Sequence, residues 1–381
     1  MKRFQIILII VSLIILGFAM QSWGALNNYR ELNELSIISS IGIDKQDNGD
    51  YSISVQVMNT KKGKNESEGD EGGSEVVVYK QSAGTISLAL QNMIKESPKK
   101  LYTAHMKLLV INEKLAREEG ISIILDYFFR DVQSNKEFVT LIARDTSAED
   151  VLKTLSPIEI NPAKDLVDSY GTMLLYQGNT ANSVASNLLE LYLEPGISVV
   201  CASVVVKDDK AEISDIAYFK DEKLKGYLDW FNNVAYNFLQ DNISNTVVEL
   251  SYEGDSLAFE VFKSSTKYNI TEENGIFTIN FNIQTRGNVI EMENVEINKT
   301  SGDISKMQAD ISSQLKEKLE RYVNNTKYTY DTDIMGIEML VRKFQNKAYS
   351  KVKDKFDFRD VRVNISVKTE IANEGGLLKK W

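Results

Sequence analysis

The feature that most constrains this chain is an uncharged apolar run at residues 4–20, directly after Lys2 and Arg3. As a helix rising 1.5 Å per residue, this run would be roughly 25 Å long, slightly short of a ~30 Å hydrocarbon core. That length fits a signal peptide cleaved before Met20 or Ala25, and it also fits a short membrane-spanning anchor. We favour an uncleaved anchor, with the basic pair in the cytoplasm and the rest of the chain outside. The residues assigned to the anchor are Phe4, Ile6, Leu8, Ile10, Leu13, Ile15 and Phe18.

The sequence after this run predicts a multi-domain α+β fold. Strand patterns at residues 36–43 and 51–58 flank an Asn-Gly turn signal, and residues 59–75 contain no apolar side chain, which predicts a flexible loop. Helical stripes follow, and residues 199–207 and 211–219 predict a hairpin around Asp208, so we expect mixed and antiparallel sheets with packed helices. We divide the chain into a signal or anchor segment at 1–24, an N-terminal α/β domain at 25–156, a linker with a helical connection at 157–196, and a C-terminal α+β domain at 197–376 with room for two subdomains.

Two residue counts limit the chemistry, because the chain has one histidine, His105, and one cysteine, Cys201. A single cysteine excludes an intramolecular disulfide, and this pair cannot supply the usual zinc ligands. Cys201 lies in an apolar strand pattern and is expected to be a buried small hydrophobe. His105 is expected to be structural, since the chain has no nucleophile-elbow sequence. We therefore predict no catalytic residue, no metal site and no cofactor, although an all-carboxylate metal site stays open.

The net charge of −10 argues against nucleic acid and against anionic lipid headgroups as partners. Contact with a membrane would then come from the anchor or from a protein partner. Among the acidic pairs, Asp331 and Asp333 stand just before a helical stripe at residues 334–344. We interpret Asp333 as the N-cap of that helix and the stripe as core.

Three stretches carry motifs in a fixed order. The first has Arg-Glu-Leu at 30–32 and a strand pattern that ends in Gly-Ile-Asp at 42–44, the second spans 97–131, and the third spans 333–344. Together they resemble the Ger(x)C family of spore germination proteins, over nearly the whole chain after the anchor. The motif residues, to which we assign structural roles only, are Arg30, Glu31, Leu32, Gly42, Asp44, Pro98, His105, Gly120, Asp126, Asp131, Asp333 and Gly336.

The resemblance implies a C subunit of a germinant receptor, with a body on the outer face of the spore inner membrane. Its expected partners are a polytopic A subunit and a transporter-like B subunit, in a receptor that responds to small nutrients. No enzymatic activity is expected of the family. Family members usually carry a lipid-modified cysteine shortly before Arg-Glu-Leu, but residues 23–30 contain none. The apolar segment would therefore stay as an anchor, or the cleaved chain would be held by its partners.

Two other classes of function stay open. An extracytoplasmic cell-wall hydrolase would need a cleft with two facing carboxylates, at least one of them with a raised pKa. A freestanding solute-binding module would need a deep pocket between domains. The receptor interpretation instead predicts broad apolar or hydrogen-bonding surface patches for partners.

Overall fold

The computed structural model describes residues 35–58, 76–97, 99–132, 134–154, 161–292 and 301–373, besides Gln5. The residues assigned to the anchor and the loop predicted at 59–75 lie outside this part of the chain. Within the described part, no helix combines the length and the apolar character needed to cross a membrane.

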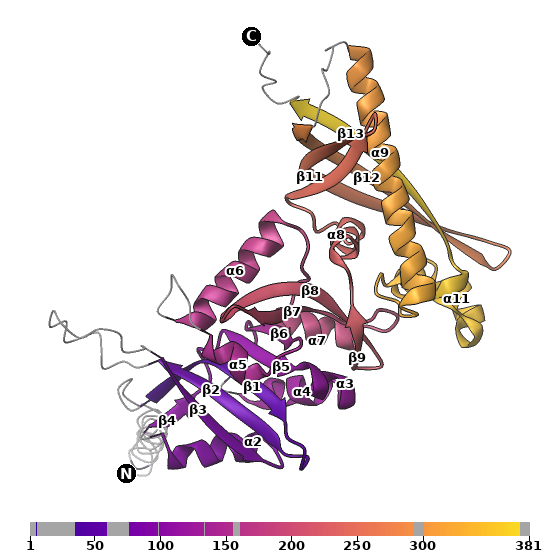
Figure 1. Ribbon diagram of the computed structural model, residues 1–381. Coiled ribbons are helices and arrows are strands. Elements are labelled where there is room, and N and C mark those ends of the chain that lie inside the picture. Colours follow the sequence, from indigo (N-terminus) through magenta and orange to yellow (C-terminus); the bar gives the residue numbers. More distant parts are fainter. Residues whose placement is uncertain are drawn as a thin grey trace, which may run out of the picture.

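The chain forms two β-sheets, stacked one above the other in Figure 1. The first is a nine-stranded mixed sheet in the order β3-β2-β1-β5-β6-β7-β8-β9, with β4 beside β1. β1, β4, β5, β6 and β7 run in the same direction, whereas β2, β3, β8 and β9 join through antiparallel pairs. The strands are β1 (Leu35–Lys45), β2 (Tyr51–Met58), β3 (Val76–Ala83), β4 (Lys100–Tyr102), β5 (Leu108–Asn112), β6 (Val139–Ala143), β7 (Val200–Lys207), β8 (Lys210–Lys220) and β9 (Lys223–Tyr227).

Helices cover both faces of this sheet, so alternate residues of its central strands are buried on opposite sides. In β5, Leu109 and Ile111 join the core on one face, and Leu108 and Val110 join the core on the other. The helices on the first face are α2 (Ile86–Asn92), η3 (Met93–Lys95), α3 (Glu113–Glu118), α4 (Ser122–Arg130) and α7 (Ala185–Leu193). Those on the second face are α5 (Ala148–Lys153) and α6 (Pro162–Tyr176).

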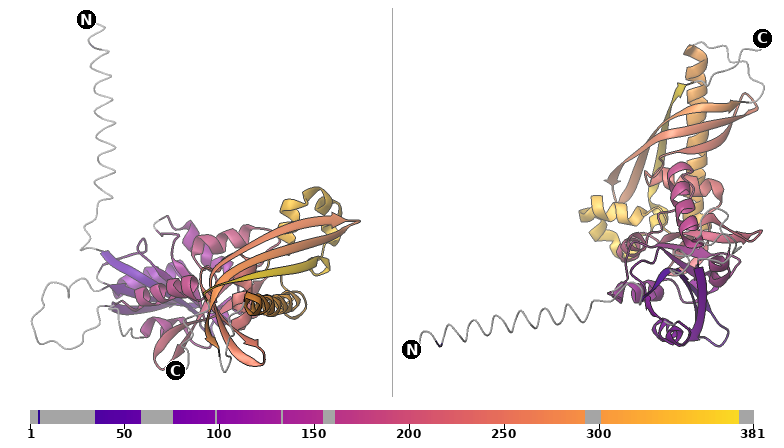
Figure 2. Two further views of the ribbon diagram at one scale, coloured as in Figure 1. Left: turned by 90° about the horizontal axis from the view of Figure 1, so that it is seen from above. Right: turned by 90° about the vertical axis from the view of Figure 1, so that its left-hand side faces the viewer.

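The second sheet has four strands in the order β10-β11-β12-β13, with β13 parallel to β12. Its strands are β10 (Thr246–Tyr252), β11 (Asp255–Glu273), β12 (Ile276–Met292) and β13 (Arg362–Asn373). The helical segments of this half are α8 (Trp230–Leu239), α9 (Ser301–Asn324), η4 (Asn325–Thr329), α10 (Ile337–Phe344), α11 (Asn346–Val352), η5 (Lys353–Lys355) and η6 (Phe358–Asp360). Ile311 and Leu315 of α9 pack against Ile279 and Phe281 of β12 in one core. Figure 2 shows that this half extends away from the first sheet.

α9 also bonds to both edge strands of the second sheet. At the β10 edge, Gln314 accepts from the backbone N–H of Ser251 at 3.0 Å. At the β13 edge, Ser312 accepts from the N–H of Thr369 at 3.0 Å, and Gln308 accepts from that of Ile371 at 2.9 Å. Three edge N–H groups that could pair with another strand are therefore already bonded.

The structure confirms the predicted α+β class and most of the predicted elements. The hairpin expected around Asp208 forms between β7 and β8, but both strands belong to the first sheet, whereas the sequence assigns every residue from 197 onward to the C-terminal domain. The division into domains stays a prediction, yet it does not follow the division into sheets. The interpretation of residues 334–344 as core is wrong at Phe344, which is 57% exposed.

Candidate functional site

A cleft of about 550 Å³ lies between the two sheets and is lined by residues of both halves of the chain. One wall is formed by Leu191 and Tyr192 at the end of α7, by residues 194–199, which connect α7 to β7, and by the end of β8 with the turn after it. The other wall is formed by residues 331–333 and by η6 with the residues before it. Clefts at domain interfaces are common positions for binding sites, so we take this cleft as the candidate site.

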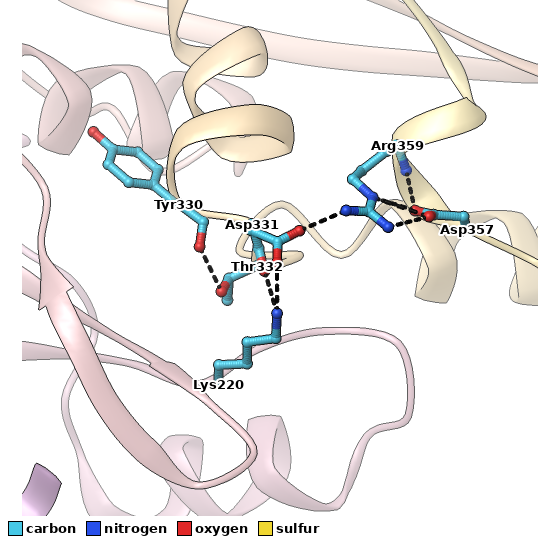
Figure 3. Close-up of polar contacts among 6 residues, drawn as sticks. All are labelled: Lys220, Tyr330, Asp331, Thr332, Asp357 and Arg359. Carbon is cyan, nitrogen blue, oxygen red and sulfur yellow. Dashed lines mark hydrogen bonds and ion pairs between the residues drawn. The ribbon is translucent and has the colours of Figure 1, made fainter.

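A row of charged groups crosses the cleft (Figure 3). Lys220 of β8 donates to the carboxylate of Asp331 at 2.8 Å and to its carbonyl at 2.9 Å. On the other side, Arg359 of η6 donates to Asp331 at 2.9 Å and to both carboxylate oxygens of Asp357. The hydrogen bond and charge of Lys220 lower the pKa of Asp331, and those of Arg359 lower the pKa of Asp357. Both acids are thus held as carboxylates.

Asp333 lies two residues further on and is 8% exposed. Its two carboxylate oxygens accept the backbone N–H groups of Ile337 and Glu338, each at 2.8 Å. Burial raises the pKa of Asp333 to about 7, although these hydrogen bonds act in the opposite direction. The capping role predicted for Asp333 is present, but the residue directly before α10 is Gly336, in the left-handed region at φ 71°. The side chain therefore caps the helix from outside the usual N-cap position.

Backbone hydrogen bonds also join the two walls of the cleft, at what we call the junction between the two halves of the chain. The N–H of Ser198 donates to the carbonyl of Asp333, and the N–H of Met339 donates to the carbonyl of Gly196, both at 2.9 Å. Gly196 has φ 80°, and a Cβ there would lie 2.7 Å from the nitrogen of Met339. A Cβ on Gly336 would lie 2.9 Å from Cδ1 of Ile197. The two halves approach so closely here because both positions are glycine.

The acidic groups of the cleft are almost all engaged. Glu222 accepts from Tyr192 at 2.8 Å, Glu338 accepts from Tyr349 at 2.7 Å, and Glu194 forms ion pairs with Arg342 and Lys343. With Asp331, Asp333 and Asp357 bonded as above, only Asp221 of the lining acids makes no polar contact with a described residue. The described residues also contain no group of three or more ligands that could hold a metal ion. This arrangement suits structural pairing better than general acid–base chemistry.

The first motif stretch forms a second capping site, away from the cleft. The carboxylate of Asp44 accepts the N–H groups of Ala148 and Glu149 at 2.8 and 3.0 Å, so it caps α5 from β1. Burial raises the pKa of Asp44. Ser147 caps the same helix by accepting from the N–H of Asp150 at 2.9 Å. Gly42 allows this contact, since a Cβ would lie 3.1 Å from backbone atoms of Ala148.

The second motif stretch divides between the junction and the surface. A Cβ on Gly120, at φ 86°, would lie 2.7 Å from the carbonyl oxygen of Glu222, which lines the cleft. Asp131 accepts from Thr103 at 3.1 Å and from Ser134 at 2.6 Å. Asp126 forms an exposed ion pair within α4, and exposed His105 lies beside the ring of Tyr102. Arg30, Glu31, Leu32 and Pro98 lie outside the described residues.

Cys201 is buried, as predicted. Its thiol donates to the carbonyl of Thr140 at 3.2 Å, and burial raises the pKa of the thiol to about 12. The residues that the sequence does not single out are Lys220, Asp357 and Arg359. Lys220 is 111 positions from Asp331, so no local pattern could pair them. The closely spaced Asp331 and Asp333 are the only sequence signal for this site, and the sequence favours a helix-capping role for Asp333 over a binding role.

The fold and the cleft define a class of protein: an α+β body of two sheets, whose charged groups at the junction pair mainly with one another. Two family models match the chain. The model described as "Spore germination protein N-terminal domain" covers residues 28–206, and "Spore germination B3/ GerAC like, C-terminal" covers residues 214–375. The chain belongs to the Ger(x)C family of spore germination proteins.

Individual relatives agree with this assignment. Spore germination protein KC of Bacillus subtilis (strain 168) is 25% identical over 377 residues, which cover 91% of each chain. Spore germination protein B3 of the same organism is 23% identical over 354 residues, covering 91% of this chain and 93% of the relative. The crystal structure of the GerBC protein matches with a TM-score of 0.59 at 20% identity, over 87% of this chain and 97% of that chain. This last likeness shows a shared fold.

Proposed function

We propose that this protein is the non-catalytic C subunit of a nutrient germinant receptor and is needed for spore germination. The observation that carries the proposal is the order and extent of the family match: two models follow one another from residue 28 to residue 375. Relatives that match over nine tenths of their length are spore germination proteins. The whole body, rather than one shared domain, therefore resembles proteins of that process.

We further propose that the body lies on the outer face of the spore inner membrane, beside polytopic A and B subunits. The apolar run at residues 4–20 and the preceding Lys2 and Arg3 support this orientation. A net charge of −10 gives the body little attraction for anionic lipid as a whole, so the anchor and the partner subunits would hold it there.

The engaged acids of the cleft favour this proposal over a hydrolase. Asp333 has a raised pKa, but both of its oxygens already accept backbone N–H groups. Asp331 and Asp357 hold cations instead of facing each other as free carboxylates. A second candidate, a solute-binding module, is favoured by the cleft volume of about 550 Å³, which is typical of ligand sites. Titrating the purified chain with small nutrients would test that candidate directly.

Deletion of the gene tests the proposed function. Spores without the chain should lose germination in response to one set of nutrients and keep germination by a trigger that bypasses nutrient receptors. A copy of the gene in trans should restore the response. Normal germination with every nutrient, in a strain without other receptors of this family, would contradict the proposal.

A further inference from the structure

The second sheet has one buried face and one open face. Along β12, Phe281 and Ile283 point into the core, whereas Asn282, Gln284 and Arg286 between and beyond them are exposed. The partners of these exposed residues in the sheet are exposed or half-exposed as well. The helices α8, α9 and α10 pack on the core side, so they leave the other side to solvent.

Where β11, β12 and β13 run together, the directly paired positions of the open face all carry polar side chains, and Phe262, at a bulge of β11, lies beside the guanidinium of Arg286. Direct cross-strand partners place three side chains in each of five rows, and we call these fifteen positions the polar face. Its extent is roughly 26 Å along the strands and about 10 Å across them. The rows are Lys263, Arg286 and Glu370; Ser265, Gln284 and Lys368; Lys267, Asn282 and Ser366; Asn269, Asn280 and Asn364; and Thr271, Thr278 and Arg362.

The polar face is basic, although the chain as a whole has a net charge of −10. It holds five cations and one anion, and that anion, Glu370, pairs with Arg286 at 3.1 Å. Lys263, Lys267, Arg362 and Lys368 form no ion pair with any described residue. Other acids on the same side, Glu249, Glu260, Glu273 and Glu291, lie toward β10 or at the β11–β12 turn, so they border the face.

Amides and hydroxyls fill the positions between the cations. Asn364 donates to Asn280 at 2.8 Å, whereas Asn269, Asn282 and Gln284 have no side-chain hydrogen bond to a described residue. Free amides both donate and accept, so they suit a ligand rich in hydroxyl and amide groups. These side chains lie on the face of the sheet, so a ligand that binds them would lie across the strands.

We propose that the polar face binds an anionic peptide-bearing polysaccharide, namely peptidoglycan, whose sugars carry hydroxyl and acetamido groups and whose stem peptides carry carboxylates. The cations match the carboxylates, and the amide side chains match the hydroxyl and acetamido groups. A lipid surface fits less well, because all fifteen positions are polar and the neighbouring Phe262 lies beside the guanidinium of Arg286. The inference rests on the proposed function in one respect: the body must lie outside the cytoplasm, where such a polymer is present.

The test uses the detergent-solubilised full chain, sedimented with purified peptidoglycan sacculi at low and high salt. A charge variant carries Lys267→Glu, Arg362→Glu and Lys368→Glu. A matched control carries Lys210→Glu, Lys225→Glu and Lys351→Glu, at exposed lysines of β8, β9 and α11. The charge variant should bind about tenfold more weakly, and the control should bind like the wild type. Binding should also fall at high salt.

An amide variant with Asn269→Ala, Asn282→Ala and Gln284→Ala keeps the charge and should weaken binding several-fold at either salt concentration. Unchanged thermal unfolding would show that each variant is folded. Loss in the charge variant without loss in the amide variant would overturn polysaccharide recognition. Three other results would also overturn the proposal: equally weakened binding in the control variant, no binding of the wild type to sacculi, or wild-type binding to phosphatidylglycerol vesicles instead of sacculi that the charge variant loses. None of these measurements reads germination, so failure here would leave the proposed function standing.

Discussion

The ammonium group of Lys220, at the end of β8, donates hydrogen bonds to the carboxylate of Asp331 at 2.8 Å and to its carbonyl oxygen at 2.9 Å. The two residues belong to different halves of the body, so this contact ties one half to the other. Arg359 on the opposite side of Asp331 extends the tie to Asp357 (Figure 3). In a receptor subunit, such a junction would hold the two halves in one relative orientation.

Replacing Asp331 should loosen this junction more than it lowers stability, because exposed ion pairs contribute little to unfolding free energy. In Asp331→Ala we expect faster hydrogen exchange at the amides of Ser198 and Met339, which bridge the halves. Asp126→Ala, which removes an exposed ion pair inside α4, serves as the control. Equal exchange at both amides in wild type and Asp331→Ala would show that the ion pairs do not hold the junction.

Gly196→Ala should destabilise the protein strongly, because the new Cβ would lie 2.7 Å from the backbone nitrogen of Met339. Gly254 also has a positive φ, but a Cβ there would meet no atom within 4 Å, so Gly254→Ala isolates the cost of the backbone conformation. Chemical denaturation should give a loss of about 1 kcal/mol for Gly254→Ala and about 2 to 4 kcal/mol for Gly196→Ala. Equal losses would mean that close contact at Gly196 has no energetic role.

The cap on α5 should depend on the Asp44 carboxylate. Asp44→Ala leaves the N–H groups of Ala148 and Glu149 without their acceptor and should cost about 1 to 2 kcal/mol of unfolding free energy. Asp44→Asn keeps one acceptor oxygen, so its loss should be smaller. The measurement is urea denaturation of the three proteins, and an Asn variant less stable than the Ala variant would argue against capping.

Asp333 should make stability depend on pH. Its folded pKa of about 7 lies above its ordinary value of 3.8, so the folded state holds the proton more tightly than the unfolded state. The stabilisation that protonated Asp333 contributes is therefore fully present below about pH 4. It declines as the pH rises toward 7 and then levels off, and the total loss is at most about 4 kcal/mol. Asp333→Asn cannot titrate and should lack this slope. The difference in unfolding free energy between the two proteins, measured from pH 4 to pH 8, should fall with pH; a flat or rising difference would refute the assignment.

Local patterns predict much of this fold. Apolar strand residues and the turn at Asp208 are sufficient for the β7–β8 hairpin, because strand pairing across a short turn depends on nearby residues. The sequence predicts a helical connection within residues 157–196 but does not locate α6, since its buried face is sparse and consists of Ala163, Leu166 and Tyr170. Its start is nevertheless marked, because Asn161 caps the helix and Pro162 occupies its first position.

Long-range relationships are beyond local patterns. Nothing near β7 or β8 tells which of two sheets they will join, because that choice depends on the cores that form around them. The same limit applies to the cleft, whose charged row unites residues 220, 331, 357 and 359. The need for glycine at positions 196 and 336 is apparent only from the structure, in which the loop at Ile197 packs directly against the start of α10.

Affinity purification from detergent-solubilised spore membranes tests most directly whether this chain works as one subunit of a membrane receptor, as we propose. A tagged, functional copy of the chain should recover two polytopic membrane proteins in comparable amounts, and an unrelated tagged protein from the same membrane should not recover them. Mass spectrometry of the eluate identifies and quantifies the partners. Recovery of the chain alone, under conditions that keep other membrane complexes intact, would contradict the account.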